Sequence, residues 1–124
     1  MLQSDVNHPN GYCWPKISII TATFNAGLTL PSLIESLRAQ SDHNFEWILV
    51  DGTSTDETIE IIKGAGNLVS TWISEPDFGI YHALNKAIRL STSEYYLVLG
   101  ADDRLFPDAI AQYRRHATLS GADL

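Results

Sequence analysis

Cysteine is almost absent from this chain of 124 residues, which contains a single one, Cys13. One thiol cannot form a disulfide within the chain, and it cannot supply the several thiolates of a structural zinc site. Stability has to come from a packed core instead, for which this length suffices in one domain. The lack of disulfides also fits a reducing, intracellular setting.

Basic residues are scarce as well. Lys and Arg number 8 against 15 Asp and Glu, which gives a net charge of −7. Binding to a nucleic-acid phosphate backbone needs a basic stripe, and the sequence has none. The one pair of adjacent arginines, Arg114-Arg115, is expected on the solvated face of a terminal helix. The composition thus argues against nucleic acid as a partner.

Long apolar runs are also missing. The mostly apolar stretches at 17–22, 47–50 and 95–99 are far shorter than the roughly 20 residues that a membrane-spanning helix needs. Residues 1–10 lack the basic start and the apolar stretch of a signal peptide. The sequence therefore predicts a soluble, cytoplasmic protein, with peripheral association at the cytoplasmic face of the membrane as a second option.

Two parts of the chain differ in pattern. Residues 1–15 are polar, show no period and are interpreted as a leader, whereas residues 16–124 form the predicted domain. In this domain apolar runs typical of buried strands alternate with helical patterns. The predicted strands lie at 17–23, 45–50, 68–74 and 95–99, and the predicted helices at 30–37, 54–63, 80–88 and from 107 onward.

This alternation predicts an α/β fold with three layers, α/β/α. Its sheet is mostly parallel and doubly wound, with the strands in 3-2-1-4 order. The second helix is expected to start with a capping box formed by Ser54 and Glu57.

Acidic residues follow three of the predicted strands: Asp51, Asp77 and the pair Asp102-Asp103. Parallel strands bring their carboxyl ends to one edge of a sheet, where open α/β proteins bind ligands. Each acid also has a purely structural interpretation. Asp51 can shape a turn, Asp77 can cap a helix, and the pair can lie in a solvated loop. Two adjacent carboxylates repel each other, however, and a divalent cation relieves that repulsion.

Four segments, taken together and in this order, resemble the nucleotide-sugar-binding part of a family 2 glycosyltransferase of the GT-A fold. They are SIITATFN at 18–25, EWILVDGTSTD at 46–56, SEPDFGIY at 74–81 with Asn85-Lys86, and LGADD at 99–103. The resemblance covers about residues 16–108. One departure is His82, which stands where close members of the family commonly have aspartate.

The resemblance assigns most of these residues to the donor substrate, a sugar linked to UDP, GDP or dTDP. The implied contacts with base, ribose, diphosphate and sugar come from Thr21, Thr23, Phe24, Asn25, Asp51, Asp77, Asn85, Lys86 and Asp102. Asp51 would accept a hydrogen bond from the base, and Asp77 would lie near the diphosphate and the sugar. Asp103, with Asp102 beside it, would hold Mg²⁺ or Mn²⁺, which stabilises the departing diphosphate.

The implied activity is sugar transfer with inversion onto a polysaccharide or glycolipid acceptor. Family members continue beyond the acidic pair with acceptor-binding segments that carry the general base, whereas this sequence ends at Leu124. We therefore expect a truncated chain in which no residue is assigned as the base. We also expect self-association, because Phe106, Ile110 and Tyr113 would lack their usual partners.

Two other functions stay open at this stage. One is a non-catalytic module that binds a nucleotide sugar or a partner protein. The other is a phospho-acceptor signalling domain, which also gathers acids at strand ends. Such a domain needs a lysine at the end of a late strand, and the sequence shows none there.

Overall fold

Four parallel strands form the centre of the fold: β1 (Ile17–Thr23), β2 (Phe45–Asp51), β3 (Thr71–Ser74) and β4 (Tyr95–Val98). The structure is a computed structural model that describes residues 16–93 and 95–120, with side chains up to residue 116. The strand order is β3-β2-β1-β4, which confirms the predicted 3-2-1-4 arrangement. The predicted leader, residues 1–15, and the carboxyl-terminal residues 121–124 lie outside the described residues.

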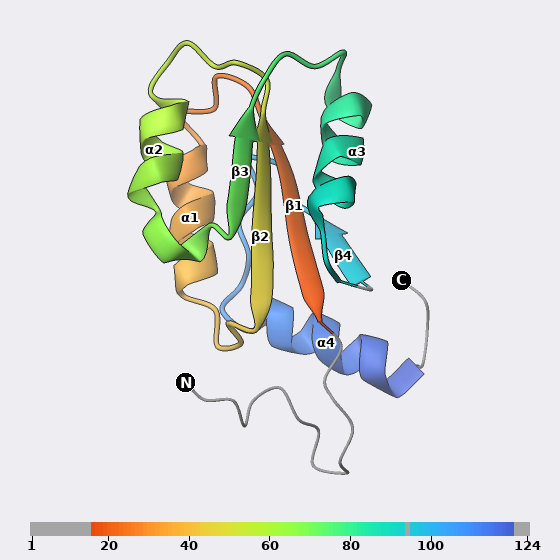
Figure 1. Cartoon of the computed structure of the whole chain (residues 1–124). Helices are drawn as coiled ribbons and strands as arrows, with labels where there is room; N and C mark the ends of the chain where they lie inside the picture. The colour runs from red at the N-terminus through yellow and green to blue at the C-terminus, as the bar shows by residue number, and fades with distance from the viewer. Residues whose placement is uncertain (1–15, 94, 121–124) are drawn as a thin grey trace.

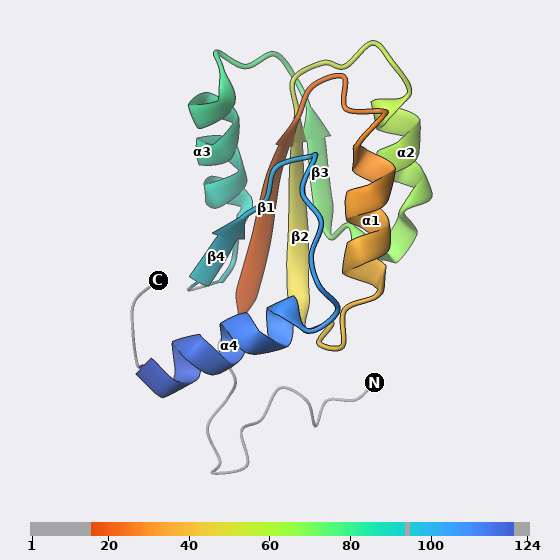
Figure 2. The same cartoon turned by 180° about the vertical axis from the view of Figure 1, so that it is seen from behind.

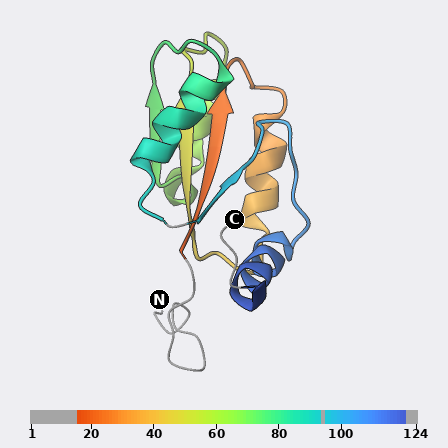
Figure 3. The ribbon, with the colours of Figure 1, turned by 90° about the vertical axis from the view of Figure 1, so that its right-hand side faces the viewer.

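Helices cover both faces of this sheet and give three layers (Figures 1 and 3). Helices α1 (Leu30–Arg38) and α2 (Thr58–Gly64) pack on one face, and α3 (Ile80–Leu90) packs on the other. Helix α4 (Ala109–Ser120) crosses the end of the sheet where the strands begin, on the side of α1 (Figure 2). None of the described helices combines the length and the apolar character needed to cross a lipid bilayer.

The core explains why β1 and β2 read as nearly continuous apolar runs. Side chains alternate along a strand, so Ile19 and Trp47 face α1 while Ile20 and Ile48 face α3. All four are fully buried because both faces of the sheet are covered. Burying each such side chain contributes about 1.5–3 kcal/mol, so the two central strands hold much of the stability.

Two predicted element boundaries were wrong. Strand β3 begins at Thr71 instead of residue 68, because Gly66 adopts a φ of 63° and residues Gly66–Leu68 form a short 3₁₀ turn, η2. Helix α2 begins at Thr58, and no Ser54 capping box forms. The Thr58 amide donates to Asp56 Oδ1 at 2.9 Å, whereas the Ser54 hydroxyl is used elsewhere.

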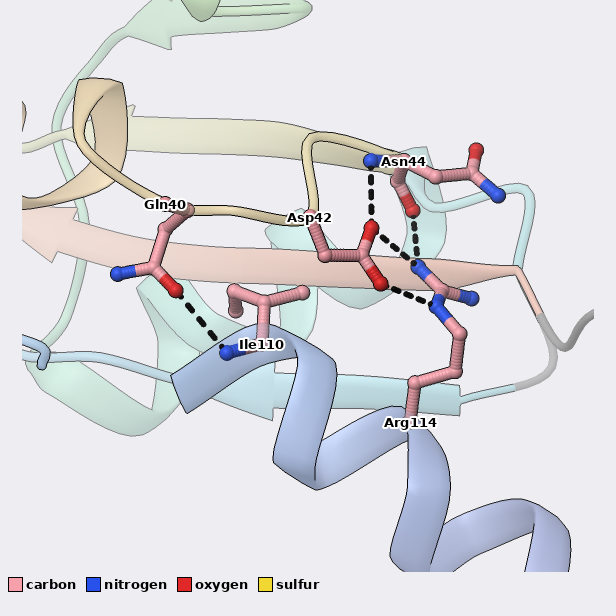
Figure 4. A network of polar contacts seen from close by, with 5 residues as sticks. All are labelled: Gln40, Asp42, Asn44, Ile110 and Arg114. Atoms are coloured by element: carbon pink, nitrogen blue, oxygen red, sulfur yellow. Dashed lines mark hydrogen bonds and ion pairs between the residues drawn. The ribbon is translucent and has the colours of Figure 1, made fainter. Parts of the chain in front are cut away.

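Two expectations for α4 were also wrong. Arg114 is buried, and its Nε donates to Asp42 Oδ2 at 2.7 Å, so it does not lie on a solvated face (Figure 4). Ile110 is fully buried in the core on the α1 side, so it has partners within the chain. Phe106, which was expected to lack a partner together with Ile110 and Tyr113, is 81% exposed as predicted.

Candidate functional site

Three neighbouring strands end at the same level, and their last residues are polar. In the sheet register Thr23 of β1 pairs with Asp51 of β2, which in turn pairs with Ser74 of β3. The loops that follow these strands meet at this carboxyl edge, which is the upper edge in Figure 1. The sheet thus places side chains from three segments, far apart in sequence, beside one another.

Asp51 is the hub of this edge. Its side chain is fully buried, with 0% exposure, and accepts four hydrogen bonds. Oδ1 accepts from Thr23 Oγ1 and Ser54 Oγ, both at 2.6 Å. Oδ2 accepts from the Ser54 backbone amide at 2.8 Å and from Ser74 Oγ at 2.9 Å. A carboxylate offers about four lone-pair positions, so this one is fully occupied by the protein itself.

The hydrogen bonds to Asp51 determine the direction in which its pKa is shifted. Burial raises the pKa of the Asp51 carboxyl, but the hydrogen bonds from Ser54, Thr23 and Ser74 lower it by more, so that the pKa lies below its ordinary value. Asp51 is therefore ionised at neutral pH. A buried negative charge with only hydroxyl and amide partners fixes the loop that surrounds it.

Asn25 joins the first loop to the second. Its backbone amide donates to Ser54 Oγ at 2.7 Å, and its Oδ1 accepts from the Thr55 amide at 2.8 Å. Asn25 and Thr53 both have left-handed backbones, with φ of 49° and 63°. Such a conformation is uncommon for residues other than glycine, and here the cross-loop bonds hold it in place.

Two residues predicted to border the base lie in different surroundings. Thr21 is fully buried, and its Oγ1 accepts a hydrogen bond from the Trp47 indole at 3.0 Å, so it belongs to the core. Phe24, three residues further along, is 63% exposed at the open edge of the sheet. The structure thus brings Thr23, Phe24 and Asn25 to the edge, and leaves Thr21 beneath it.

Asp77 reaches the same edge from the loop after β3. A Cβ atom added to Gly52 would lie 2.8 Å from Asp77 Oδ2, which places this carboxylate against the loop that follows Asp51. Asp77 Oδ1 accepts from the Gly79 amide at 3.1 Å, just before α3. The capping interpretation and the site interpretation of Asp77 are therefore compatible.

Helix α3 supports the Asp77 loop from below. Lys86 is buried, and its Nζ donates to the Pro76 carbonyl and pairs with Glu75, both at 2.8 Å. His82 Nδ1 accepts from the Phe78 amide at 2.9 Å, so the residue that departs from the family pattern secures the turn before the helix. Asn85 lies on the exposed side of α3.

The acidic pair Asp102-Asp103 lies in the loop between β4 and α4. Both residues are exposed. Asp103 Oδ2 accepts from the Gly100 amide at 2.7 Å, and the Asp103 amide donates to the Gly100 carbonyl at 3.1 Å, which closes a tight turn. Within the described residues no three His, Cys, Asp or Glu side chains come together as a metal cluster. The acids at the strand ends thus remain separate groups.

The prediction missed the serines around Asp51. Ser54 was interpreted as a helix cap, and Ser74 only as the end of a strand, yet both donate to the buried carboxylate. The spacing from Asp51 to Ser54 is that of a turn in which an aspartate accepts from residues just beyond it, and that spacing was the available signal. The bond to Ser74 has no local signal, since it depends on strand pairing.

Comparisons with known proteins show the family to which this chain belongs. The sequence matches the family model described as glycosyl transferase family 2 over residues 18–123. A curated relative, the PGL/p-HBAD biosynthesis glycosyltransferase of Mycobacterium bovis (strain BCG / Pasteur 1173P2), is 42% identical over 95 residues. That match covers 74% of this chain and 37% of the relative, so the chain spans little more than a third of that protein's length.

Solved structures share the fold. Staphylococcus aureus TarS 1-349 in complex with UDP gives a TM-score of 0.76 at 23% identity, covering 87% of this chain and 33% of that one. Mannosyltransferase PcManGT from Pyrobaculum calidifontis, in complex with GDP-Man and Mn²⁺, gives 0.70 at 25% identity, covering 86% and 32%. The sheet has the GT-A architecture of these neighbours. Because the family model covers most of its length, the chain belongs to glycosyltransferase family 2.

Proposed function

We propose that this chain is the donor-binding part of an inverting, metal-dependent glycosyltransferase. It transfers a sugar from a nucleoside diphosphate to a polysaccharide or glycolipid acceptor. The observation that carries the proposal is the ordered edge around Asp51, where the ends of β1, β2 and β3 are locked together in a family 2 chain. Neighbours of the same fold bind UDP and GDP-Man, which supports a nucleoside diphosphate as the donor group.

The base and ribose lie, in this proposal, over the loops after β1 and β2. The exposed Phe24 ring offers an apolar surface for a flat base, and Asn25 holds the neighbouring loop in position. Asp51 orders this loop through its four hydrogen bonds. It accepts from a base N–H only when the Ser54 side chain turns away and frees a lone pair.

The diphosphate and its metal ion belong near Asp102 and Asp103. Mg²⁺ and Mn²⁺ prefer oxygen ligands, and Mg²⁺ is commonly held by one or two carboxylates together with substrate phosphates. Two exposed carboxylates on a tight turn fit that description without a third protein ligand. When bound, the cation supplies positive charge to the departing diphosphate. Asp102 additionally approaches the ribose.

Asp77 is proposed to face the sugar and the diphosphate from the opposite loop. Lys86 acts on this loop rather than on the substrate, because its Nζ is engaged by Pro76 and Glu75. Asn85, on the exposed side of α3, is a secondary contact. Asp77 is therefore a direct contact, and the helix behind it sets its position.

The acceptor and the general base are not assigned to residues of this chain. The chain spans 37% of the first relative, and we propose that both belong to the part of such proteins that it does not match. The proposed setting is the cytoplasm, at the membrane face when the acceptor is lipid-linked.

Calorimetry tests the proposal. UDP, GDP and dTDP are titrated into the chain with and without Mn²⁺, and at least one should bind weakly, with the metal required. Asp103→Ala should abolish the effect of Mn²⁺ and weaken binding by about tenfold or more, the equivalent of about 1.4 kcal/mol.

Asp108→Ala is the matched control. Asp108 is an exposed acid in the same loop, and its Oδ2 accepts from Gln112 Nε2 of α4 at 2.9 Å. Its removal should leave nucleotide binding unchanged. An Asp103→Ala variant that binds as tightly as the unmodified chain, or that keeps the full effect of Mn²⁺, would contradict the metal assignment. Absence of nucleotide binding in the unmodified chain would count against a donor-binding part and favour an interaction module.

A further inference from the structure

We propose that Gln40 is a positioning residue for the acidic pair, and that it acts by anchoring the segment from 99 to 108, here called the metal loop. The inference rests on the proposed function, since it concerns how the chain places the metal-binding carboxylates. Gln40 lies between α1 and β2, far from the pair in sequence. Its position in the fold brings it to the end of the metal loop (Figure 4).

Gln40 is 3% exposed, and its side-chain amide makes three hydrogen bonds. Nε2 donates to the Phe106 carbonyl at 2.7 Å and to the Ser36 carbonyl at 3.0 Å. Oε1 accepts from the Ile110 amide at 3.0 Å. A buried amide is costly unless it is bonded, so the observed bonds fix both the side chain and its partners.

Two of these bonds hold the place where the metal loop joins α4. The Ile110 amide is in the first turn of α4, where amides have no partner inside the helix, so Gln40 caps this helix from another element. The Phe106 carbonyl is within the metal loop itself. Next to it, the Ser41 amide donates to the Pro107 carbonyl at 2.8 Å.

The other end of the metal loop is held by the sheet. The Leu99 amide donates to the Ile20 carbonyl of β1 at 3.0 Å, and Leu105 packs against the core on the α1 side. Asp102 and Asp103 therefore lie on a short tight turn between two fixed points. Loss of the Gln40 bonds leaves the Ser41–Pro107 bond at this end of the loop, and the weaker anchor lets the two carboxylates move relative to the edge around Asp51.

A second contact between the same two elements provides a matched control. The Asp42 carboxylate pairs with Arg114 further along α4, and it does not touch the metal loop (Figure 4). Asp42→Asn should loosen α4 while leaving residues 99–107 anchored. Gln40→Met removes all three amide bonds at similar volume. Gln40→Glu keeps the acceptor for Ile110 but loses the donor to Phe106.

Hydrogen exchange of the full chain tests the anchoring without any ligand. Gln40→Met should speed exchange of the Asp103 and Ala109 amides by about tenfold, the effect of losing roughly one hydrogen bond, with β1 unchanged. Gln40→Glu should do the same at Asp103 while the Ile110 amide stays protected. Asp42→Asn should not alter exchange at Asp103.

Nucleotide titration gives a second readout that a loss of stability alone would not produce. With Mn²⁺ present, both Gln40 variants should bind the nucleoside diphosphate several-fold more weakly. Without metal, their affinity should equal that of the unmodified chain. Asp42→Asn should match the unmodified chain in both conditions.

The outcomes separate the two proposals. Unchanged exchange in the metal loop of both Gln40 variants, or equal acceleration by Asp42→Asn, would overturn the positioning role. An affinity that falls equally with and without Mn²⁺ would overturn it as well. If the unmodified chain binds no nucleotide, the proposed function fails, and hydrogen exchange alone then decides whether Gln40 orders the loop.

Discussion

At Asp51 the protein surrounds a buried negative charge with hydroxyl and amide donors. Four donors, from two strand ends and one loop, satisfy it, so the charge stabilises the arrangement of the edge. The position of Asp51 at the carboxyl edge of the sheet was predictable, because this residue follows an apolar strand. Its burial was not predictable, because it depends on Thr23 and Ser74, which come from other strands.

Replacing the Asp51 carboxylate should lower the stability of the folded chain. Asp51→Asn puts an amide group where at least one donor now binds, and leaving one buried donor without an acceptor costs about 1–3 kcal/mol. Urea unfolding at pH 7 should show a loss in this range. An unfolding free energy equal to that of the unmodified chain would contradict the role of Asp51 as a hub.

The same carboxylate predicts how stability depends on pH. Its pKa is lower in the folded chain than in the unfolded one, so its contribution is present above the unfolded pKa of about 4 and is lost as the pH falls through the folded pKa. Stability of the unmodified chain should therefore fall on acidification below about pH 4. Asp51→Asn should show a weaker fall over this range in the same urea series.

Among the elements, β1 was predicted with its correct bounds, and α1 and α3 nearly so. Strand β1 is a nearly continuous apolar run, and the apolar residues of α1 and α3 recur with a helical period, so the local sequence is enough to predict them. The start of β3 and the start of α2 were missed because both depend on turns, namely the left-handed Gly66 and the Asp56 bond to Thr58. The docking of α4 was missed for another reason. Arg114 meets Asp42 only through the tertiary fold, and no local pattern reports that contact.

Two threonines of β1, only two positions apart, have different roles: Thr21 belongs to the core and Thr23 to the candidate site. Thr21 and Thr23 lie on the same face, yet one binds the Trp47 indole and the other binds Asp51. Thr21→Val should lower stability by about 1–3 kcal/mol, because the buried indole N–H loses its acceptor, without changing nucleotide affinity. Thr23→Val should weaken nucleotide binding, because it loosens the hub.

Calorimetry together with urea unfolding separates these two variants. Valine keeps the shape of threonine, so neither change should alter the sheet. If Thr21→Val lost as much nucleotide affinity as Thr23→Val, Thr21 would contribute to nucleotide binding, as the resemblance to the family implied.

For the molecule as a whole, the described surface has an apolar side near β4. Within the described sheet β4 is an edge strand, and Tyr96 and Val98 on it are 44% and 50% exposed. The Tyr113 hydroxyl donates to the Tyr96 carbonyl at 3.3 Å, which covers only part of this edge. Open strand edges with apolar side chains tend to pair with other chains.

We therefore predict that the chain self-associates through β4 as its concentration rises. Val98→Lys should reduce this association without unfolding, because a charge on an edge strand opposes pairing and the side chain is half exposed already. Light scattering over a concentration series measures the effect. Leu28→Lys, at an exposed apolar position in the loop before α1, is the control and should change nothing. A monomer at every concentration would contradict the prediction.

The central position of β1 also has a consequence for the order in which the chain folds. Ile17 pairs with Phe45 through one helical crossover, but with Tyr95 only after the rest of the sheet has been made. Closing the longer loop costs more entropy, and the shorter one is also completed first during synthesis. The loops around Asn25 and Asp51 can therefore assemble before β4 joins the sheet. The acidic turn is then added to an edge that is already ordered, so the two sides of the proposed donor site form at different times.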